Sequence, residues 1–230
     1  MPTSKSRASS RDFSKLFKAE LQKGHLVEHH LYTSSLSPSG RRVDVLLNEK
    51  QLEIPTTELN LINLEHKSPN IKKLNPFQRV PFLVLPNGST LTESISICRY
   101  LEGLKPIPNL FGKTALETAK IDMWIRRIEF SLFLPIAFVF RNTHPKMTKL
   151  EKQIPEVAKK NKQIVDKSLK ELNSLIKNDL FLAINRFSMA DIMLITSLEF
   201  STFIKADLSA LNHLEDYKKR IGKKACFKWP

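Results

Sequence analysis

Residues 77–83, FQRVPFL, and residues 91–95, LTESI, decide the fold of this chain more than any other stretch. Pro81 stands at the entrance of a short apolar strand, although proline cannot donate a hydrogen bond to a strand ladder. Its position therefore indicates a specialised bend before the strand. Cis X-Pro bonds are concentrated in tight turns, so the bond between Val80 and Pro81 is a candidate for the cis form.

A hairpin and a helix follow this bend. The sequence PNG at 86–88 is a strong turn signal between the apolar runs 82–85 and 90–91. The polar residues 92–94, TES, then open a helix, whose first backbone N–H groups have no partner within the helix itself. We therefore expect an anion-binding site at this helix start.

The patterns from residue 30 onward predict two domains. The first contains a β-α-β segment, a hairpin and a helix, which together make a compact mixed sheet with helices packed on it. Two prolines within residues 104–110 block helix formation and mark a linker, after which helical periodicity dominates. The expected strands are 30–33, 57–60, 82–85 and 90–91, and the expected helices are 40–50, 71–74, 94–101, 115–140 with a kink at Pro135, 154–176, 189–203 and 214–221.

The bend at Val80-Pro81, taken together with Glu93-Ser94, resembles the glutathione-binding half of glutathione S-transferases. The likeness extends over residues 29–104, which resemble a thioredoxin-like domain throughout. Within them, residues 31–43, LYTSSLSPSGRRV, are similar to the opening of theta-type members. Residues 187–192, FSMADI, are similar to the capping motif of the family's helical second domain.

This resemblance, which covers residues 29–225, implies a fold, an activity and partners. The fold would be an α/β thioredoxin-like N-terminal domain at 29–103, a linker at 104–110 and an all-α helical-bundle domain at 111–230. The chain would be a cytoplasmic, homodimeric glutathione transferase of the theta-like or a related microbial branch. It would join glutathione, its co-substrate, to hydrophobic electrophiles, and it would need no cofactor and no metal.

The reactive form of glutathione is its thiolate, which is scarce at neutral pH. A hydroxyl donor at a helix N-terminus lowers a thiol pKa and positions the anion. By ungapped comparison Ser37 occupies the position of the catalytic serine in theta-type members, and we expect it to take this role. The alternative is that 37–40, SPSG, is an ordinary loop and helix cap. Ser34, Ser35 and Ser39 are close rivals, because a shift of one residue changes the assignment.

The resemblance also implies which residues hold the peptide. Glu93 would pair with the γ-glutamyl ammonium, while Ser94 and the helix N–H groups would bind the adjacent carboxylate. Val80 would bond the cysteinyl segment through its backbone, which the bend at Pro81 makes possible.

Two further groups of residues would complete the site. His66 and Arg79 match the positions that bind the glycyl carboxylate, with an exposed loop histidine and a surface cation as the simpler alternatives. The electrophile pocket would be lined by the long helix through Trp124, Arg127 and Phe130. Large apolar residues are more often simply part of a core, which is the alternative for this group.

Ser188 and Asp191 have the spacing of a helix cap, in which the acid reaches back to the residue three positions before it. We expect this pair to have a structural role at the start of the helix that follows.

The composition is that of a globular chain, with 41% hydrophobic and 26% charged residues among 230. No window approaches the about eighteen consecutive apolar residues of a membrane-spanning helix. Cys98 and Cys226 lie far apart without a CxxC or histidine partner. This pattern argues against a disulfide framework or a zinc site and favours a reducing compartment.

The net charge of +14 is unevenly distributed. Residues 29–103 hold 8 basic and 7 acidic residues, residues 1–28 hold 6 and 3, and residues 104–230 hold 23 and 13. Clustered lysine and arginine attract phosphate, so contact with nucleic acid is one interpretation. A solvated basic helix face is the simpler one.

Residues 1–28 are rich in serine, lysine and arginine and lack the hydrophobic core of a secretory signal peptide. An amphipathic pattern at 13–21 would suit an organellar targeting segment, but Asp12 and Glu20 argue against it because such segments are poor in acids. We expect a basic, disordered or partly helical extension.

Two other functions stay open from the sequence. Glutathione-dependent peroxide reduction uses the same thiolate. Alternatively, the transferase fold could serve as an adaptor or regulator that binds anionic partners through its basic helical domain, since a fold does not imply a function.

Overall fold

The computed structural model describes residues 24–177 and 180–228. These residues divide into two compact units that part after Pro108, which lies inside the linker expected at 104–110. We refer to them as the N-terminal unit and the C-terminal unit. The predicted extension at 1–28 lies mostly outside the described residues. Within the described ranges, no helix combines the length and apolarity that are needed to cross a membrane.

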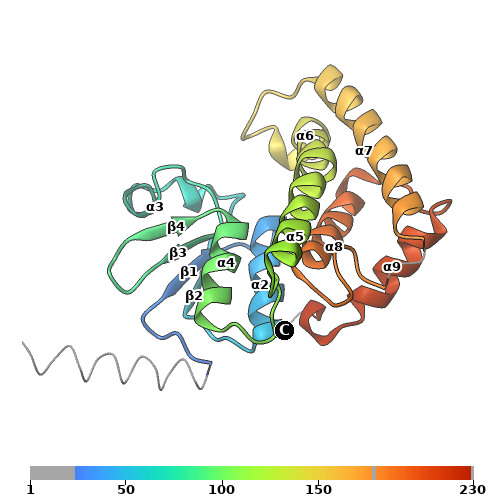
Figure 1. Cartoon of the computed structure of the whole chain (residues 1–230). Coiled ribbons are helices and arrows are strands. Elements are labelled where there is room, and N and C mark those ends of the chain that lie inside the picture. Colours follow the sequence, from blue (N-terminus) through green and yellow to red (C-terminus); the bar gives the residue numbers. More distant parts are fainter. Residues whose placement is uncertain (1–23, 178–179, 229–230) are drawn as a thin grey trace, which may run out of the picture. The chain divides into compact units, whose positions relative to one another are not determined.

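The N-terminal unit is built on a four-stranded mixed sheet (Figure 1). β1 runs parallel to β2 and antiparallel to β3, and β3 and β4 form the predicted hairpin. The bond between Val80 and Pro81 is cis. The strands are β1 (His30–Thr33), β2 (Thr56–Glu58), β3 (Phe82–Val84) and β4 (Thr90–Thr92), in the order β2-β1-β3-β4.

The helices that pack on this sheet are α2 (Pro38–Lys50), α3 (Pro69–Leu74) and α4 (Ser94–Leu104), with the short 3-10 helix η1 (Glu65–Lys67) before α3. The predicted starts of α2 and α3, at 40 and 71, were wrong by two residues. Proline fits the first turn of a helix because its missing N–H has no helical partner there. The earlier start makes Ser37 the N-cap residue of α2.

Side chains alternate across the sheet and build a core on each face. Tyr32 and Phe82 are register partners whose rings stack with centroids 4.6 Å apart, and Phe82 packs with Ile71 of α3. Leu31 and Leu83 are fully buried on the opposite face, where α2 and α4 lie side by side (Figure 1). The two helices whose first turns form the candidate site are therefore supported by the same face of the sheet.

All regular secondary structure among the described residues of the C-terminal unit is helical (Figure 1). Every residue of α8 except Glu199 is buried, so this helix is the core of the unit. The helices are α5 (Ala115–Ile128), the π-helical turn η2 (Glu129–Phe133), α6 (Leu134–Thr143), η3 (Pro145–Met147), α7 (Pro155–Leu175), α8 (Met189–Ser201), η4 (Thr202–Ile204), α9 (Asn212–Gly222) and η5 (Ala225–Phe227).

The single helix expected over 115–140 is interrupted by η2, so the prediction of one continuous helix with a simple kink was wrong. Pro135 has no N–H, and the carbonyl of Ser131, one turn earlier, therefore loses its helical donor. The hydroxyl of Ser168 on α7 donates to this carbonyl at 2.6 Å. The helix forms one π-helical turn at this point, where the Ser168 hydroxyl replaces the backbone N–H as the donor to Ser131.

The predicted pairing of Ser188 and Asp191 is present at the start of α8. The Asp191 carboxylate accepts hydrogen bonds from the backbone N–H and the hydroxyl of Ser188, at 2.7 and 2.8 Å. It also accepts the backbone N–H of Leu182 at 2.9 Å and the hydroxyl of Tyr217. Burial raises the pKa of Asp191, against the effect of these donors. The residue thus links α8, α9 and the segment before α8 in one buried network.

Candidate active site

Ser37 caps the N-terminus of α2. Its Oγ accepts a hydrogen bond from the backbone N–H of Gly40 at 3.2 Å. The bond uses a lone pair of the oxygen and leaves the hydroxyl hydrogen available for donation. Gly40 permits this close arrangement, because a Cβ there would lie 2.3 Å from Oγ1 of Thr33. The helix start is therefore held tightly against the end of β1.

The neighbouring serines are engaged differently. The hydroxyl and the backbone N–H of Ser35 both donate to the Glu58 carboxylate, at 2.5 and 3.0 Å. These two bonds lower the pKa of Glu58, so the carboxylate stays charged and the Ser35 hydroxyl stays committed. Ser34 is only 1% exposed. Ser39 lies inside the first turn, and its hydroxyl accepts from the Arg42 guanidinium at 3.4 Å. Among these serines, Ser37 is the one that caps α2.

The start of α4 lacks the side-chain cap that α2 has. Its N-cap residue, Glu93, has a φ of 66°, is exposed, and makes no capping hydrogen bond through its side chain. A non-glycine residue with positive φ is uncommon. Ser94 is the first helical residue and 7% exposed, and its Oγ accepts from Arg42 at 3.0 Å. This turn therefore offers N–H groups and a hydroxyl to a carboxylate, beside an acid that suits an ammonium.

The loop before β3 is held by Asn75, which is fully buried. Its Nδ2 donates to the carbonyl of Arg79 at 2.8 Å, and its Oδ1 accepts the backbone N–H two residues further on at 3.1 Å. β3 begins at Phe82, so Val80 lies just ahead of the strand ladder. Backbone groups at such a position are suited to pairing with an extended ligand.

His66 and Arg79 interact through the charge of Arg79. Burial lowers the pKa of the His66 imidazole, and the positive charges of Lys67 and Arg79 lower it further. The Nδ1 of His66 is buried and has no hydrogen-bond partner within the described residues. Arg79 is exposed. An imidazole and an exposed guanidinium are both groups that can donate hydrogen bonds to a carboxylate.

The residues expected at the electrophile lie on the surface of the C-terminal unit. The Arg127 guanidinium stacks over the Trp124 ring, 5.2 Å from its centroid. Phe130 is 62% exposed, and Phe138, further along the same face, is 43% exposed. The alternative that Phe130 simply belongs to a core is therefore wrong. An exposed apolar face runs instead along η2 and α6, which is a feature of interaction sites.

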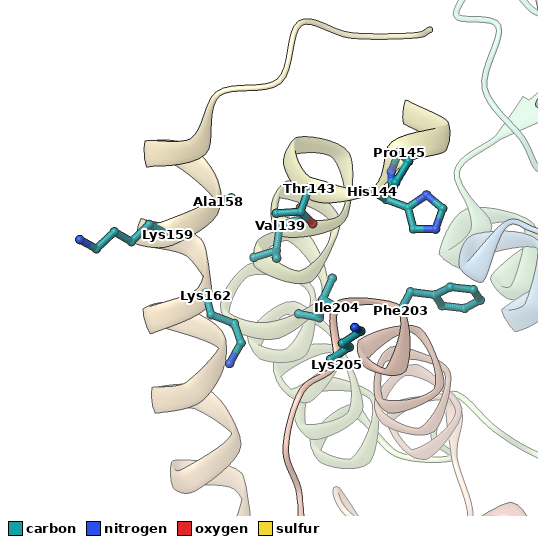
Figure 2. A pocket seen from close by; sticks show the side chains of 10 residues that line it. All are labelled: Val139, Thr143, His144, Pro145, Ala158, Lys159, Lys162, Phe203, Ile204 and Lys205. Carbon is teal, nitrogen blue, oxygen red and sulfur yellow. The ribbon is translucent and has the colours of Figure 1, made fainter. Parts of the chain in front are cut away.

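A hollow of about 510 Å³ lies elsewhere in the C-terminal unit, between the end of α6, the start of α7 and η4 (Figure 2). Val139 and Ile204 contribute buried apolar surface to it, and Lys162 and Lys205 reach its edge from α7 and from the end of η4. Lys162 also pairs with Asp166 one turn further along α7. Trp124, Arg127 and Phe130 are not among the lining residues, so this hollow and the predicted electrophile residues are separate features.

Cys98 is not suited to act as a reactive thiol. It is fully buried, and burial raises the pKa of its thiol to about 12, so it stays protonated at neutral pH. Within residues 24–177 and 180–228, no group of three or more His, Cys, Asp or Glu side chains could hold a metal ion.

Sequence reasoning assigned no role to Arg42 or to Asn75. The signal available for Asn75 was its place directly before Pro76, at the end of a predicted helix. Arg42 is buried in α2, and an arginine three and four residues before the apolar Val45 and Leu46 was the corresponding signal.

The fold and the two helix starts define a thioredoxin-like protein with a helical second unit. Residues 36–104 match the family model for the N-terminal domain of glutathione S-transferase, and residues 131–224 match the model for its C-terminal domain. The chain belongs to the glutathione S-transferase family, and its activity is that of a glutathione transferase. The family and the fold class predicted from the sequence are confirmed.

The chain is similar to glutathione S-transferase 2 of Saccharomyces cerevisiae, with 29% identity over 180 residues, which is 76% of this chain and 77% of that protein. The crystal structure of Gtt2 from Saccharomyces cerevisiae superposes on this chain with a TM-score of 0.81 at 27% identity. The match covers 86% of this chain and 98% of the Gtt2 chain. The chain is also similar to the probable elongation factor 1-gamma 1 of Arabidopsis thaliana, with 29% identity over 171 residues. That match covers 73% of this chain and 39% of the elongation factor.

Proposed function

We propose that this enzyme transfers the glutathione thiolate to hydrophobic electrophiles, with Ser37 as the catalytic residue. The observation that carries the proposal is the Ser37 hydroxyl at the start of α2, which accepts the Gly40 N–H and keeps its own hydrogen for a sulfur anion. A donor beside a helix N-terminus stabilises a thiolate and lowers the thiol pKa. The thiolate sulfur then forms a bond to the electrophilic carbon, and the leaving group departs with its electron pair.

The rest of the peptide is held along the N-terminal unit. Glu93 pairs with the γ-glutamyl ammonium, and Ser94 with the uncapped N–H groups of α4 binds the neighbouring carboxylate. Val80 bonds the cysteinyl segment through its backbone, ahead of the strand ladder. The partly buried imidazole of His66 and the exposed guanidinium of Arg79 receive the glycyl carboxylate.

The electrophile contacts Trp124, Arg127 and Phe130 in this proposal, which the exposure of the Phe130 ring supports. Reduction of organic hydroperoxides uses the same thiolate and is a second reaction of the same site. We propose further that the enzyme acts in the cytoplasm as a homodimer.

The test combines binding with turnover. Calorimetry on the full chain should show that glutathione and S-methylglutathione bind, because both carry the groups that the helix starts recognise. Turnover should then be measured on aryl halides, epoxides and a lipid hydroperoxide, and the ratio of these rates separates conjugation from peroxide reduction. A protein that binds neither peptide and converts none of these substrates would refute the proposal.

A second candidate function is the binding of a polyanion through the C-terminal unit. On α7, Lys162 pairs with Asp166 and Lys167 with Glu171. The segment 217–228, in α9 and η5, has no acidic residue. The likeness to an elongation factor 1-gamma favours a role beyond catalysis for this fold. The basic residues of the segment are Lys218, Lys219, Arg220, Lys223, Lys224 and Lys228.

Binding to a single-stranded RNA homopolymer at increasing salt tests this second function. The variant Lys218→Glu/Lys223→Glu should bind more weakly and with a shallower salt dependence, because fewer counterions are released. The matched variant Lys162→Glu/Lys167→Glu on α7 should bind almost as the wild type does, because acids already pair with both lysines. Weak binding that does not respond to salt, or an equal loss in both variants, would exclude a specific surface on α9 and η5.

A further inference from the structure

Arg42 joins the two helix starts of the proposed site. It lies in the second turn of α2 and is only 2% exposed. Its Nη1 donates to Oγ of Ser94 at 3.0 Å and, at a longer distance of 3.4 Å, to Oγ of Ser39. One guanidinium therefore connects the first turn of α2, which Ser37 caps, to the first residue of α4.

Arg42 is a buried cation that contacts the first turns of two helices. The N-terminus of a helix also carries a partial positive charge. A carboxylate that binds at the start of α4 would therefore be favoured by both charges.

The hydrogen bond from Arg42 also fixes what Ser94 can do. A serine oxygen accepts two hydrogen bonds and donates one. Because the guanidinium occupies an acceptor position, the hydroxyl hydrogen of Ser94 points away from Arg42. The charged donor polarises the O–H bond, and hydrogen bonds in such a chain strengthen one another. Ser94 is thereby prepared as a donor to a carboxylate.

We propose that Arg42 is a positioning residue for the γ-glutamyl carboxylate of glutathione. It acts through the hydroxyl of Ser94 and does not touch the peptide. The inference rests on the proposed function, since it requires that Ser94 binds this carboxylate. It assigns to Arg42 the recognition of one chemical group of the co-substrate, which is more specific than general support of the fold.

The experiment compares glutathione with 4-aminobutanoyl-cysteinyl-glycine, which lacks only the γ-glutamyl carboxylate. Arg42→Met should raise the Kd for glutathione roughly tenfold, the loss expected for a hydrogen bond to a charged group. The Kd for the analogue should change by no more than about twofold, because the analogue lacks the carboxylate on which Arg42 acts. KM for glutathione should rise by a larger factor than kcat falls. Arg42→Lys should restore part of the discrimination, since it keeps a cation close to Ser94.

Arg41 provides a matched control. It is the neighbouring arginine of α2, it is 4% exposed, and its charge acts on Asp44. Arg41→Met should leave the ratio of the two Kd values unchanged. On a Ser94→Ala background, Arg42→Met should have no further effect on the Kd for glutathione, because the hydroxyl through which it acts is gone.

The outcomes separate this inference from the proposed function. Equal weakening of both peptides by Arg42→Met would overturn the inference and leave the proposed function intact, and so would a full effect on the Ser94→Ala background. If the wild-type chain binds neither peptide, the proposed function fails and the inference fails with it. If Arg42→Met melts below the assay temperature, Arg42→Lys takes its place. The ratio of the two Kd values is then compared between Arg42→Lys and Arg42→Lys/Ser94→Ala.

Discussion

The Nζ of Lys50 lies 2.6 Å from Oε2 of Glu102, and the two side chains are 0% and 10% exposed. The ammonium also donates to two backbone carbonyls of the segment that follows α4, at 2.6 and 2.8 Å. Lys50 ends α2, and Glu102 lies in the last turn of α4. The bond between Arg42 and Ser94 joins the same two helices near their starts. Polar contacts thus fix this helix pair at both ends, which holds the two first turns in register.

Removal of one partner of the Lys50–Glu102 pair should destabilise the N-terminal unit. Lys50→Met leaves a buried carboxylate and two carbonyls without their cation, and breaking a buried pair typically costs about 3–5 kcal/mol. The double variant Lys50→Met/Glu102→Met should lose less than the sum of the two single losses, because the lone buried charge is gone. Denaturant unfolding of the four proteins measures this coupling. Strictly additive losses would show that the two groups do not stabilise each other.

Ser37→Ala should raise the thiol pKa of bound glutathione and lower kcat/KM by about 10²-fold, the loss typical for removing one donor to a reacting anion. The Kd for S-methylglutathione should stay the same, because that peptide has no thiol to ionise. The ultraviolet absorbance of the thiolate as a function of pH gives the pKa. Ser35→Ala is the control, since the Ser35 hydroxyl is bonded to Glu58. A raised thiol pKa in the Ser35 variant instead would move the catalytic role away from Ser37.

Local sequence signals predicted the elements of the fold well. The turn at 86–88, the proline at 81 and the pair Ser188 and Asp191 act over a few residues, and each of them lies where the sequence placed it. The interruption at η2 was not predictable in the same way. Its stabilising donor, the Ser168 hydroxyl, comes from another helix, and no local pattern reports that contact.

The same limit applies to the candidate site. Ser94, named from the family resemblance, stands at a helix start that the sequence signals placed correctly, and Ser37 stands at one that they placed two residues too late. Arg42 and Lys50 were missed, because their partners lie 52 residues or more away along the chain, and only the packing of α2 against α4 brings them together. A single sequence can show a cation among the apolar residues of a helix, but it does not show which acceptors that cation contacts.

Asp44 should make the N-terminal unit less stable as the pH rises. Burial raises the pKa of Asp44 from 3.8 to about 6, an effect that the charge of Arg41 opposes and that of Glu58 increases. The folded protein therefore retains a proton that the unfolded chain releases. This contribution is complete below about pH 4 and is lost as the pH rises through about 6. It amounts to no more than about 3 kcal/mol.

Asp44→Asn tests this dependence, because asparagine stays neutral at every pH. Its free energy of unfolding should vary less between pH 4 and pH 7 than that of the wild type, and the variant should be the more stable protein at pH 7. Denaturant midpoints at both pH values give the comparison. An unchanged or steeper dependence in the variant would assign the pH effect to other groups.

The π-helical turn η2 should depend on the Ser168 hydroxyl, which replaces the backbone donor that Pro135 lacks. Ser168→Ala removes the hydroxyl that bonds the Ser131 carbonyl at 2.6 Å, and it should lower the free energy of unfolding by about 1–3 kcal/mol, because a buried acceptor loses its partner. On a Pro135→Ala background the same change should cost clearly less, since the new backbone N–H can bond that carbonyl as in a regular helix. Ser174→Ala on α7, an exposed residue whose hydroxyl bonds the carbonyl of Lys170 on its own helix, is the control and should have little effect. If Ser168→Ala costs the same free energy of unfolding in both backgrounds, the Ser168 hydroxyl does not compensate for the N–H that Pro135 lacks.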